Sequence, residues 1–321
     1  MSDQILNRNT GLDLVRATEA AALAAARWMG LGSRDEADRA ATAAMAQALD
    51  TLNIDGRIVI GEEGRTASSD LISGRQVGSG RGALVDLVAD PIDGRRLVAQ
   101  GRAGAIAVAV IATRGAMWSP GPVAYLEKLV VNREAGAALV PECLDAPAAW
   151  TLALIARAKG KQVRDLVVFL LDRPRHSDLL DEIRAAGARV MLADDGDISG
   201  AVLAASPDSP VDMLMGVGGA AEGVIAACAV KALGGAMLAR LAPQRDEERA
   251  ALAGAGLDQR RILSCEDLVT GQQIFFVATG ITDGLLLSGV RFQDERATTN
   301  SLILRCETRT RRIIQAEHLV G

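Results

Sequence analysis

The chain has 321 residues, of which 49% are apolar, so it can bury a large core and has the length of about two domains. A net charge of −5 argues against a polyanion-binding surface, and an aromatic content of 2% argues against single-stranded nucleic acid binding by base stacking. Widely spaced cysteines, an N-terminus without a signal-peptide pattern and short apolar runs predict a cytoplasmic protein that binds neither membrane nor nucleic acid.

The first 55 residues have the pattern of two helices. Thr10 with Asp13 has the spacing of a capping box, and apolar residues follow at helical spacing until Gly30. Ser33 with Glu36 has the same spacing and predicts the start of the second helix.

Asp38 lies on the apolar stripe of the second predicted helix, one turn before Ala41. An acid on a buried face needs a partner, which a metal ion or a basic residue would supply. The alternative is that Asp38 lies near the start of the helix and contacts water. The residues leave both possibilities open.

Strands follow at 57–60, 84–89 and 105–112, with a polar loop over 62–82. From about residue 148, the pattern alternates between helices at 148–158, 177–186, 198–205 and 222–233 and strands at 166–171, 189–192 and 211–216. This alternation predicts a largely parallel sheet. After Gly271 the pattern returns to strands, at 274–278, 285–292, 301–306 and 312–316. The sequence therefore predicts an α/β protein with an N-terminal metal-site domain over 1–148 and a C-terminal substrate-binding domain over 149–321.

An apolar strand beginning at Val85 ends in two carboxylates, Asp90 and Asp93, on a tight turn. Pro91 fixes the backbone after the strand and Gly94 permits a sharp exit, so both acids are expected to point toward one place. Carboxylate oxygens are the ligands that hard divalent cations prefer.

Glu62 also follows an apolar strand, and with Asp38, Asp90 and Asp93 it completes a set of four acids. Clustered carboxylates repel one another unless a cation lies between them, and Mg²⁺ or Mn²⁺ there can hold a phosphoryl group and activate a water. The alternative is four unrelated surface acids in a chain with 40 acidic residues.

Three loops of the second half have polar or glycine-rich residues directly after a predicted strand: 172–176, 194–197 and 216–223. The first holds Arg173 and Arg175, whose guanidinium groups suit phosphate. The second is acidic and suits sugar hydroxyls or a metal, and the third can admit an anion at a helix N-terminus. Each loop alone could be ordinary loop sequence, but three at corresponding strand ends favour a shared binding site.

The chain resembles the class II fructose-1,6-bisphosphatases, members of a lithium-sensitive, metal-dependent sugar phosphatase superfamily. The resemblance covers nearly the whole length. It rests on segments 7–9, 18–24, 27–30, 54–56, 125–128, 171–176, 195–197, 218–219, 222–223, 278–284 and 289–292.

The resemblance implies a two-domain layered α-β-α-β-α sugar phosphatase fold. It also implies that a metal-activated water removes the 1-phosphate of fructose 1,6-bisphosphate in gluconeogenesis. Some family members also accept sedoheptulose 1,7-bisphosphate. The implied partners are a sugar bisphosphate and further subunits, in a homo-oligomer (dimer or tetramer) or in a hetero-oligomer with an active paralogue.

The resemblance also assigns roles to residues of this chain. The implied metal ligands for Mg²⁺ or Mn²⁺ are Asp38, Glu62, Asp90, Ile92 through its carbonyl, and Asp93. The implied substrate contacts are Arg34, Gly94, Tyr125, Arg173, Arg175, Asp195, Asp197 and Glu222. The implied catalytic positions are Asp38, Glu62 and Arg95.

Three of these positions depart from the family pattern. Asp93 replaces a glutamate, Arg34 stands where a lysine is usual, and Arg95 replaces the catalytic threonine. An arginine cannot deprotonate water at neutral pH, but it can lie among carboxylates in place of one cation. We therefore expect fewer metal ions than in typical members. Two hypotheses stay open: an active bisphosphatase, or a catalytically impaired paralogue that binds a sugar phosphate or a related subunit in a regulatory or structural role.

Overall fold

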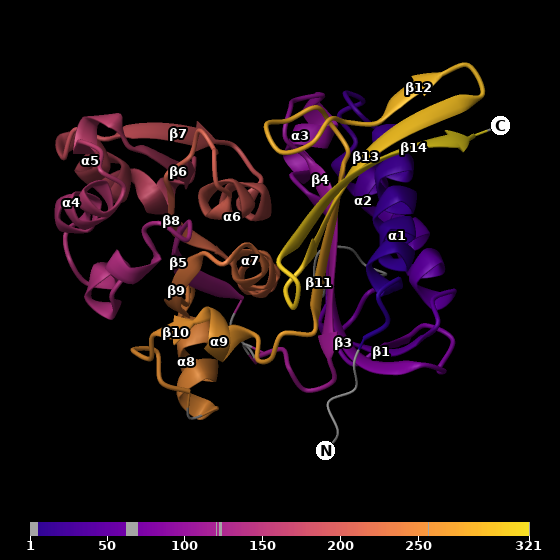
Figure 1. Ribbon diagram of the computed structural model, residues 1–321, viewed down its shortest axis with the longest axis horizontal. Helices are drawn as coiled ribbons and strands as arrows, with labels where there is room; N and C mark the ends of the chain where they lie inside the picture. The colour runs from indigo at the N-terminus through magenta and orange to yellow at the C-terminus, as the bar shows by residue number, and fades with distance from the viewer. Residues whose placement is uncertain (1–5, 62–69, 120, 122–123, 256, 321) are drawn as a thin grey trace. The chain divides into compact units, whose positions relative to one another are not determined.

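The computed structural model describes residues 6–61, 70–119, 121, 124–255 and 257–320. The chain divides into two compact units, Met1–Met117 with Gly271–Gly321, and Trp118–Thr270. Each unit combines helices with one sheet in layers (Figure 1), so the predicted α/β fold class is confirmed. The boundaries between the two units lie at 117/118 and 270/271 rather than after residue 148. The reason is that strand β5 (Tyr125–Val131) already belongs to the second sheet, and strand β11 (Ile274–Gly280) belongs to the first.

The first unit has an eight-stranded sheet in the order β12–β13–β11–β4–β3–β1–β2, with β14 paired to β13. Its strands are β1 (Ile54–Ile60), β2 (Gln76–Val77), β3 (Ala83–Asp93), β4 (Ile106–Thr113), β11 (Ile274–Gly280), β12 (Arg291–Gln293), β13 (Arg296–Arg305) and β14 (Thr310–Leu319). Strands β1 and β3 pair in parallel, and the other pairs among the described residues of this sheet are antiparallel.

Helices α1 (Thr10–Ala26), α2 (Arg34–Asp50) and α3 (Arg95–Gln100) belong to the first unit. The two predicted N-terminal helices are confirmed, and their buried faces share one core with the sheet. The capping predictions were wrong in detail. Asn9, not Thr10, is the residue before α1. Ser33 is the residue before α2, as predicted, but its hydroxyl donates to the Glu36 carboxylate at 2.5 Å and caps no backbone N–H.

The strand predicted over 285–292 is also shorter than expected, since β12 begins only at Arg291. Before it, the Gly284 N–H donates to the Leu287 carbonyl at 3.0 Å, and the Gly289 N–H donates to the Asp283 carboxylate at 3.0 Å. These bonds fold the segment into turns in place of an extended strand.

The second unit has a six-stranded sheet in the order β10–β9–β5–β8–β6–β7. Its strands are β5 (Tyr125–Val131), β6 (Val167–Leu171), β7 (Arg189–Ala193), β8 (Met213–Gly219), β9 (Ala236–Leu241) and β10 (Leu263–Ser264). The predicted parallel pairing holds for β6 with β7 and β8. The sheet is nevertheless mixed, because β5, which the alternating pattern did not include, inserts antiparallel between β8 and β9.

Helices α4 (Ala148–Ala158) and α5 (Ser177–Ala185) pack on one face of this sheet, in a core with Leu129 and Leu170. The other helices of the unit are α6 (Asp197–Ala205), α7 (Ala220–Leu233), α8 (Asp246–Gly254) and α9 (Cys265–Leu268). Short 3₁₀ helices occupy η1 (Gly136–Ala138), η2 (Pro141–Leu144), η3 (Val163–Asp165) and η4 (Pro174–His176). None of the helices in the described part of the chain is long and apolar enough to cross a membrane.

A buried carboxylate ties together three segments of the first sheet. Asp86 lies in the middle of β3 and is fully buried. Its Oδ1 is 3.4 Å from Arg57 Nη2 and 3.5 Å from Arg114 Nε, and its Oδ2 accepts the Gly115 N–H at 2.7 Å. The carboxylate therefore joins β1, β3 and the end of β4 through charge-assisted bonds.

Asp86→Ala is expected to lower the free energy of unfolding by about 3 kcal/mol, because it leaves the Gly115 N–H without this acceptor and removes the buried negative charge between the Arg57 and Arg114 guanidinium groups. The matched control is Asp13→Ala, which removes an exposed carboxylate 4.0 Å from Arg16 and should cost less than about 0.5 kcal/mol. Urea unfolding followed by circular dichroism measures both. Equal midpoint shifts for the two variants would contradict this role of Asp86.

Candidate functional site

The acidic end of β3 is buried as well as charged. Asp90, Ile92 and Asp93 are each less than 5% exposed. The register of β3 against β4 shifts between Asp90 and Asp93, and the Ile92 N–H donates to Asp90 Oδ1 at 3.1 Å. Gly94 follows with a φ of 102°, a conformation that L side chains rarely adopt, and α3 begins at the next residue. The turn therefore brings both carboxylates to the end of one strand, as predicted.

Asp38 is buried on α2, with its side chain 5% exposed, and its partner is basic. Arg95 Nη1, from the first residue of α3, lies 3.5 Å from Asp38 Oδ2. The predicted alternative of a water-exposed acid near the helix start is therefore wrong. The structure brings Asp38 together with Arg95, another of the predicted site residues.

The chemistry of the described donors suits a hard cation, since Asp38, Asp90 and Asp93 are buried carboxylates. Glu62, the fourth predicted acid, lies outside the described residues. Within the described part of the chain, no three His, Cys, Asp or Glu side chains gather closely enough to hold a metal ion by themselves. Asp90, Asp93 and the Ile92 carbonyl therefore fit a cation that takes further ligands, whereas Asp38 already has a guanidinium beside it.

Arg34, a predicted substrate contact, lines a pocket of about 450 Å³ in the first unit with Ser33, Arg96 and Gln100. Its Nε lies 3.6 Å from Asp35 Oδ1, and both side chains are more than half exposed. An exposed pair of this kind is weak and leaves the guanidinium able to exchange partners.

Gly94, another predicted substrate contact, lies in the first unit between β3 and α3. The other six predicted substrate contacts lie in the second unit. Arg173 Nη2 lies 3.0 Å from Asp195 Oδ1, and its Nη1 donates to the Asp194 carbonyl at 2.5 Å. The loop after β6 is therefore tied to the loop after β7 by a guanidinium, which is the juxtaposition that the strand-end pattern predicted.

Arg175 lies beside the end of β8. Its Nη2 donates to the Val217 carbonyl at 2.7 Å, and its guanidinium carbon lies 5.4 Å from the centre of the Tyr125 ring. Burial lowers the pKa of this guanidinium, and the charges of Tyr125, Asp197 and Glu222 act in the opposite direction. Arg175 stays protonated at neutral pH, so it presents a fixed positive charge among these groups.

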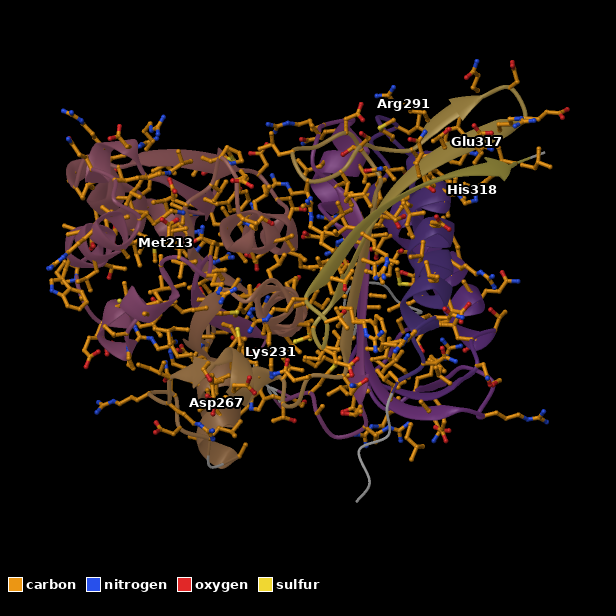
Figure 2. The ribbon with its side chains drawn as sticks, viewed as in Figure 1. Met213, Lys231, Asp267, Arg291, Glu317 and His318 are labelled. Carbon is orange, nitrogen blue, oxygen red and sulfur yellow. The ribbon has the colours of Figure 1, made fainter. Side chains whose placement is uncertain are left out.

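His176 is buried, with only 3% of its surface exposed, and both of its ring nitrogens contact the backbone. Its Nδ1 is 2.8 Å from the Leu171 carbonyl, and its Nε2 accepts the Val217 N–H at 2.8 Å. The ring is therefore neutral with the proton on Nδ1. The other histidine, His318 on β14 (Figure 2), lies 2.8 Å from the Thr299 hydroxyl.

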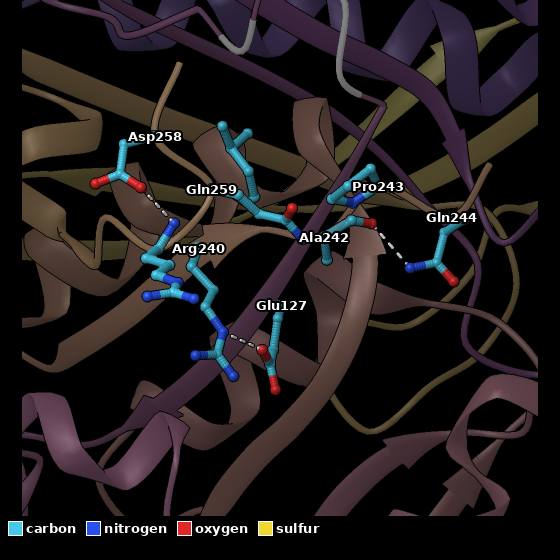
Figure 3. A pocket seen from close by; sticks show the side chains of 9 residues that line it. Glu127, Arg240, Ala242, Pro243, Gln244, Asp258 and Gln259 are labelled. Carbon is cyan, nitrogen blue, oxygen red and sulfur yellow. Dashed lines mark hydrogen bonds and ion pairs between the residues drawn. The ribbon is translucent and has the colours of Figure 1, made fainter. Parts of the chain in front are cut away.

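A second pocket, of about 590 Å³, lies in the second unit beside Glu127 and Arg240 (Figure 3). Arg240 Nε donates to Glu127 at 2.6 Å and its Nη2 donates to the Leu144 carbonyl at 2.9 Å. Its guanidinium is thus engaged in holding the sheet to the segment around η2. None of the predicted site residues lines this pocket.

One charged residue of the cluster was missed by the sequence analysis. Lys128 is fully buried on β5, and its Nζ lies 2.5 Å from Asp197 Oδ2. The signal was present in the sequence, since a lysine inside the apolar run from Leu126 to Val131 marks a buried charge that needs a partner.

Comparisons with known proteins agree over nearly the whole chain. The family described as "Bacterial fructose-1,6-bisphosphatase, glpX-encoded" matches residues 8–318. The fructose-1,6-bisphosphatase class 2 of Haemophilus influenzae is 40% identical over 98% of this chain and 97% of its own length. The fructose-1,6-bisphosphatase 1 class 2 of Escherichia coli K12 is 38% identical over 98% of this chain and 96% of its own.

The buried, neutral His176 predicts a pH dependence of stability. Burial lowers its pKa from 6.5, so below that pH the unfolded chain binds a proton that the folded chain excludes. The stabilisation is therefore complete above pH 6.5 and is lost progressively as the pH falls below it. In unfolding experiments from about pH 7.5 down to about pH 5, wild type should lose more stability than His176→Asn. Parallel curves for the two proteins would contradict this assignment.

Proposed function

The chain belongs to the bacterial class II fructose-1,6-bisphosphatase family, and we propose that it removes the 1-phosphate of fructose 1,6-bisphosphate by means of a divalent cation. It is a phosphatase of this family, a phosphoric monoester hydrolase. The observation that carries the proposal is the identity of 38–40% over 98% of the chain. Sedoheptulose 1,7-bisphosphate is the competing substrate to be tested beside it.

In this proposal, the residues of the second unit bind the sugar phosphate. Arg173 and Arg175 bind a phosphate group, because guanidinium groups form paired, charge-assisted bonds with its oxygens. The carboxylates of Asp195, Asp197 and Glu222 accept hydrogen bonds from sugar hydroxyls, and Tyr125 packs beside Arg175. Support comes from the way these side chains gather after β6, β7 and β8.

In the first unit, Asp90, Asp93, the Ile92 carbonyl and Glu62 would hold Mg²⁺ or Mn²⁺, and the ion would neutralise phosphate charge and lower the pKa of water. Asp38 and Glu62 are the carboxylates available to orient the attacking water and take its proton. Gly94 and Arg34 lie at the ends of the two segments that carry these acids and contact the phosphate.

Arg95 replaces one cation in this proposal. Its guanidinium lies beside Asp38 and supplies the positive charge that a buried carboxylate requires. It cannot act as a Lewis acid or a base, so the chain binds fewer metal ions and turns over more slowly than a member with threonine there. The same ion pair favours the second candidate function, a catalytically impaired paralogue that binds sugar phosphate or a related subunit in a regulatory or structural role.

We also propose an oligomeric state, a compartment and a pathway. Family resemblance supports a homo-oligomer, a dimer or tetramer, with a hetero-oligomer containing an active paralogue as the alternative. The four cysteines form no disulfide with one another and three are buried, which supports a reducing compartment such as the cytoplasm. There the chain acts in carbohydrate metabolism, within gluconeogenesis.

Arg95→Thr is expected to bind Mn²⁺ about tenfold more tightly than wild type, because it removes the positive charge beside Asp38 and leaves that carboxylate available as a further ligand. Its release of phosphate from fructose 1,6-bisphosphate should also be faster than that of wild type. Titration calorimetry and a phosphate assay measure the two effects, with the exposed Arg102→Thr on the neighbouring loop as the matched control.

The outcomes separate the two candidate functions. Wild-type turnover that Arg95→Thr increases supports the bisphosphatase proposal. Wild type without turnover, rescued by Arg95→Thr, supports the impaired paralogue and locates its defect. Wild-type turnover and Mn²⁺ affinity that Arg95→Thr leaves unchanged contradict the role given to Arg95.

A further inference from the structure

A buried ion pair in the second unit joins Lys128 to Asp197, one of the proposed substrate contacts. Lys128 on β5 is 0% exposed, and its Nζ lies 2.5 Å from Oδ2 of Asp197, the first residue of α6. The Asp197 side chain is 10% exposed, so one end of the pair is buried and the other reaches the surface. A lysine is rarely buried completely, since removing an ammonium from water costs several kcal/mol unless a partner compensates it.

The backbone of β8 is shaped to this pair. A Cβ at Gly218 would lie 1.9 Å from Asp197 Oδ2 and 2.5 Å from Lys128 Nζ. Neither the carboxylate nor the fully buried ammonium has room to move away, so a larger residue at this position would displace the pair. Gly218 therefore allows both charged groups to lie against bare backbone, and this fixes the side-chain torsions of Asp197.

The charges around Asp197 are arranged asymmetrically. Arg175, on the loop after β6, and Lys128 are its positive neighbours, and neutral His176 lies beside them. Glu222, at the start of α7, is a further acid whose charge acts on Arg175. Without Lys128, the Asp197 carboxylate would lose its buried positive partner, and more of its negative charge would act against an incoming phosphate.

We infer that Lys128 is a positioning residue, which holds the Asp197 carboxylate in one orientation so that its second oxygen accepts a hydrogen bond from a sugar hydroxyl. This role rests on the proposed function, and in it Lys128 acts through Asp197 without contacting the sugar itself. It assigns to Lys128 two effects on binding. The ammonium aims the acceptor at the hydroxyl, and it cancels the charge that would otherwise oppose the phosphate.

The test is Lys128→Met, which keeps the length of the side chain and removes its charge. Binding of fructose 6-phosphate, measured by titration calorimetry, is expected to weaken by about tenfold or more, because one partner of a buried charge pair has been removed. In the phosphate-release assay the loss should fall on KM, with kcat changed by less than about threefold. Asp197→Asn added to Lys128→Met should cause little further loss, since the two residues act as a unit.

The division of the loss between KM and kcat separates positioning from a merely structural role. A variant that is only less stable lowers kcat through its smaller folded fraction, whereas loss of a positioned acceptor raises KM.

Lys159→Met is the matched control. Lys159 Nζ lies 2.8 Å from Asp212, and both side chains are less than 10% exposed, so this pair is as buried as the first. Lys159→Met is expected to lower stability while leaving the affinity for fructose 6-phosphate unchanged. Should Lys128→Met fail to fold, Gly218→Ala tests the same geometry with all charges kept, beside Gly136→Ala, where a Cβ would meet its nearest neighbour at 3.5 Å.

The inference is overturned if Lys128→Met, or Gly218→Ala in its place, binds fructose 6-phosphate as wild type does. It is likewise overturned if Lys159→Met lowers the affinity equally, because any buried ion pair would then suffice. Absence of binding by wild type itself would overturn the proposed function together with the inference, so the two failures are distinguishable.

Discussion

A buried carboxylate must be given a positive partner, and this constraint recurs through both units of the protein. Asp38, Asp86, Asp197 and Asp212 are buried acids with Arg95, Arg57 and Arg114, Lys128, and Lys159 and Lys161 as their respective partners. Removing such charges from water costs several kcal/mol each, and only close oppositely charged groups offset that cost. Each pair joins different segments of the chain, so the requirement of a partner also fixes how those segments pack.

The constraint has a chemical consequence at the acidic end of β3. A carboxylate can be compensated by a metal ion or by a basic side chain, and the two are not equivalent. A metal ion polarises phosphate and activates water, whereas a guanidinium only supplies charge and directional N–H donors. Arg95 therefore compensates the charge of the buried Asp38 carboxylate without supplying the chemistry of a metal ion.

In the second unit the same constraint holds in place the side chains that we propose to bind the substrate. Lys128 compensates Asp197 from beneath, through the space that Gly218 leaves open, while Arg173 is held by Asp195. Side chains fixed in this way lose little conformational entropy when a ligand binds. The two kinds of basic side chain differ in their burial here. The Arg173 guanidinium is partly exposed, whereas the compact Lys128 ammonium is fully buried.

The sequence by itself determined the family, the α/β class and the positions of most helices and strands, because these depend on local spacing and on long matching segments. It also identified the acids after β3 and the arginines after β6, since each lies within a few residues of an apolar strand. It did not reveal β5 as a central strand inserted antiparallel between β8 and β9, because that placement depends on pairing between distant segments. Nor did it choose the partner of Asp38, or pair Lys128 with Asp197, which lies 69 residues away. Only the tertiary structure decided these partners, since any of the chain's many basic residues could compensate an acid until packing brought one of them within a few ångströms.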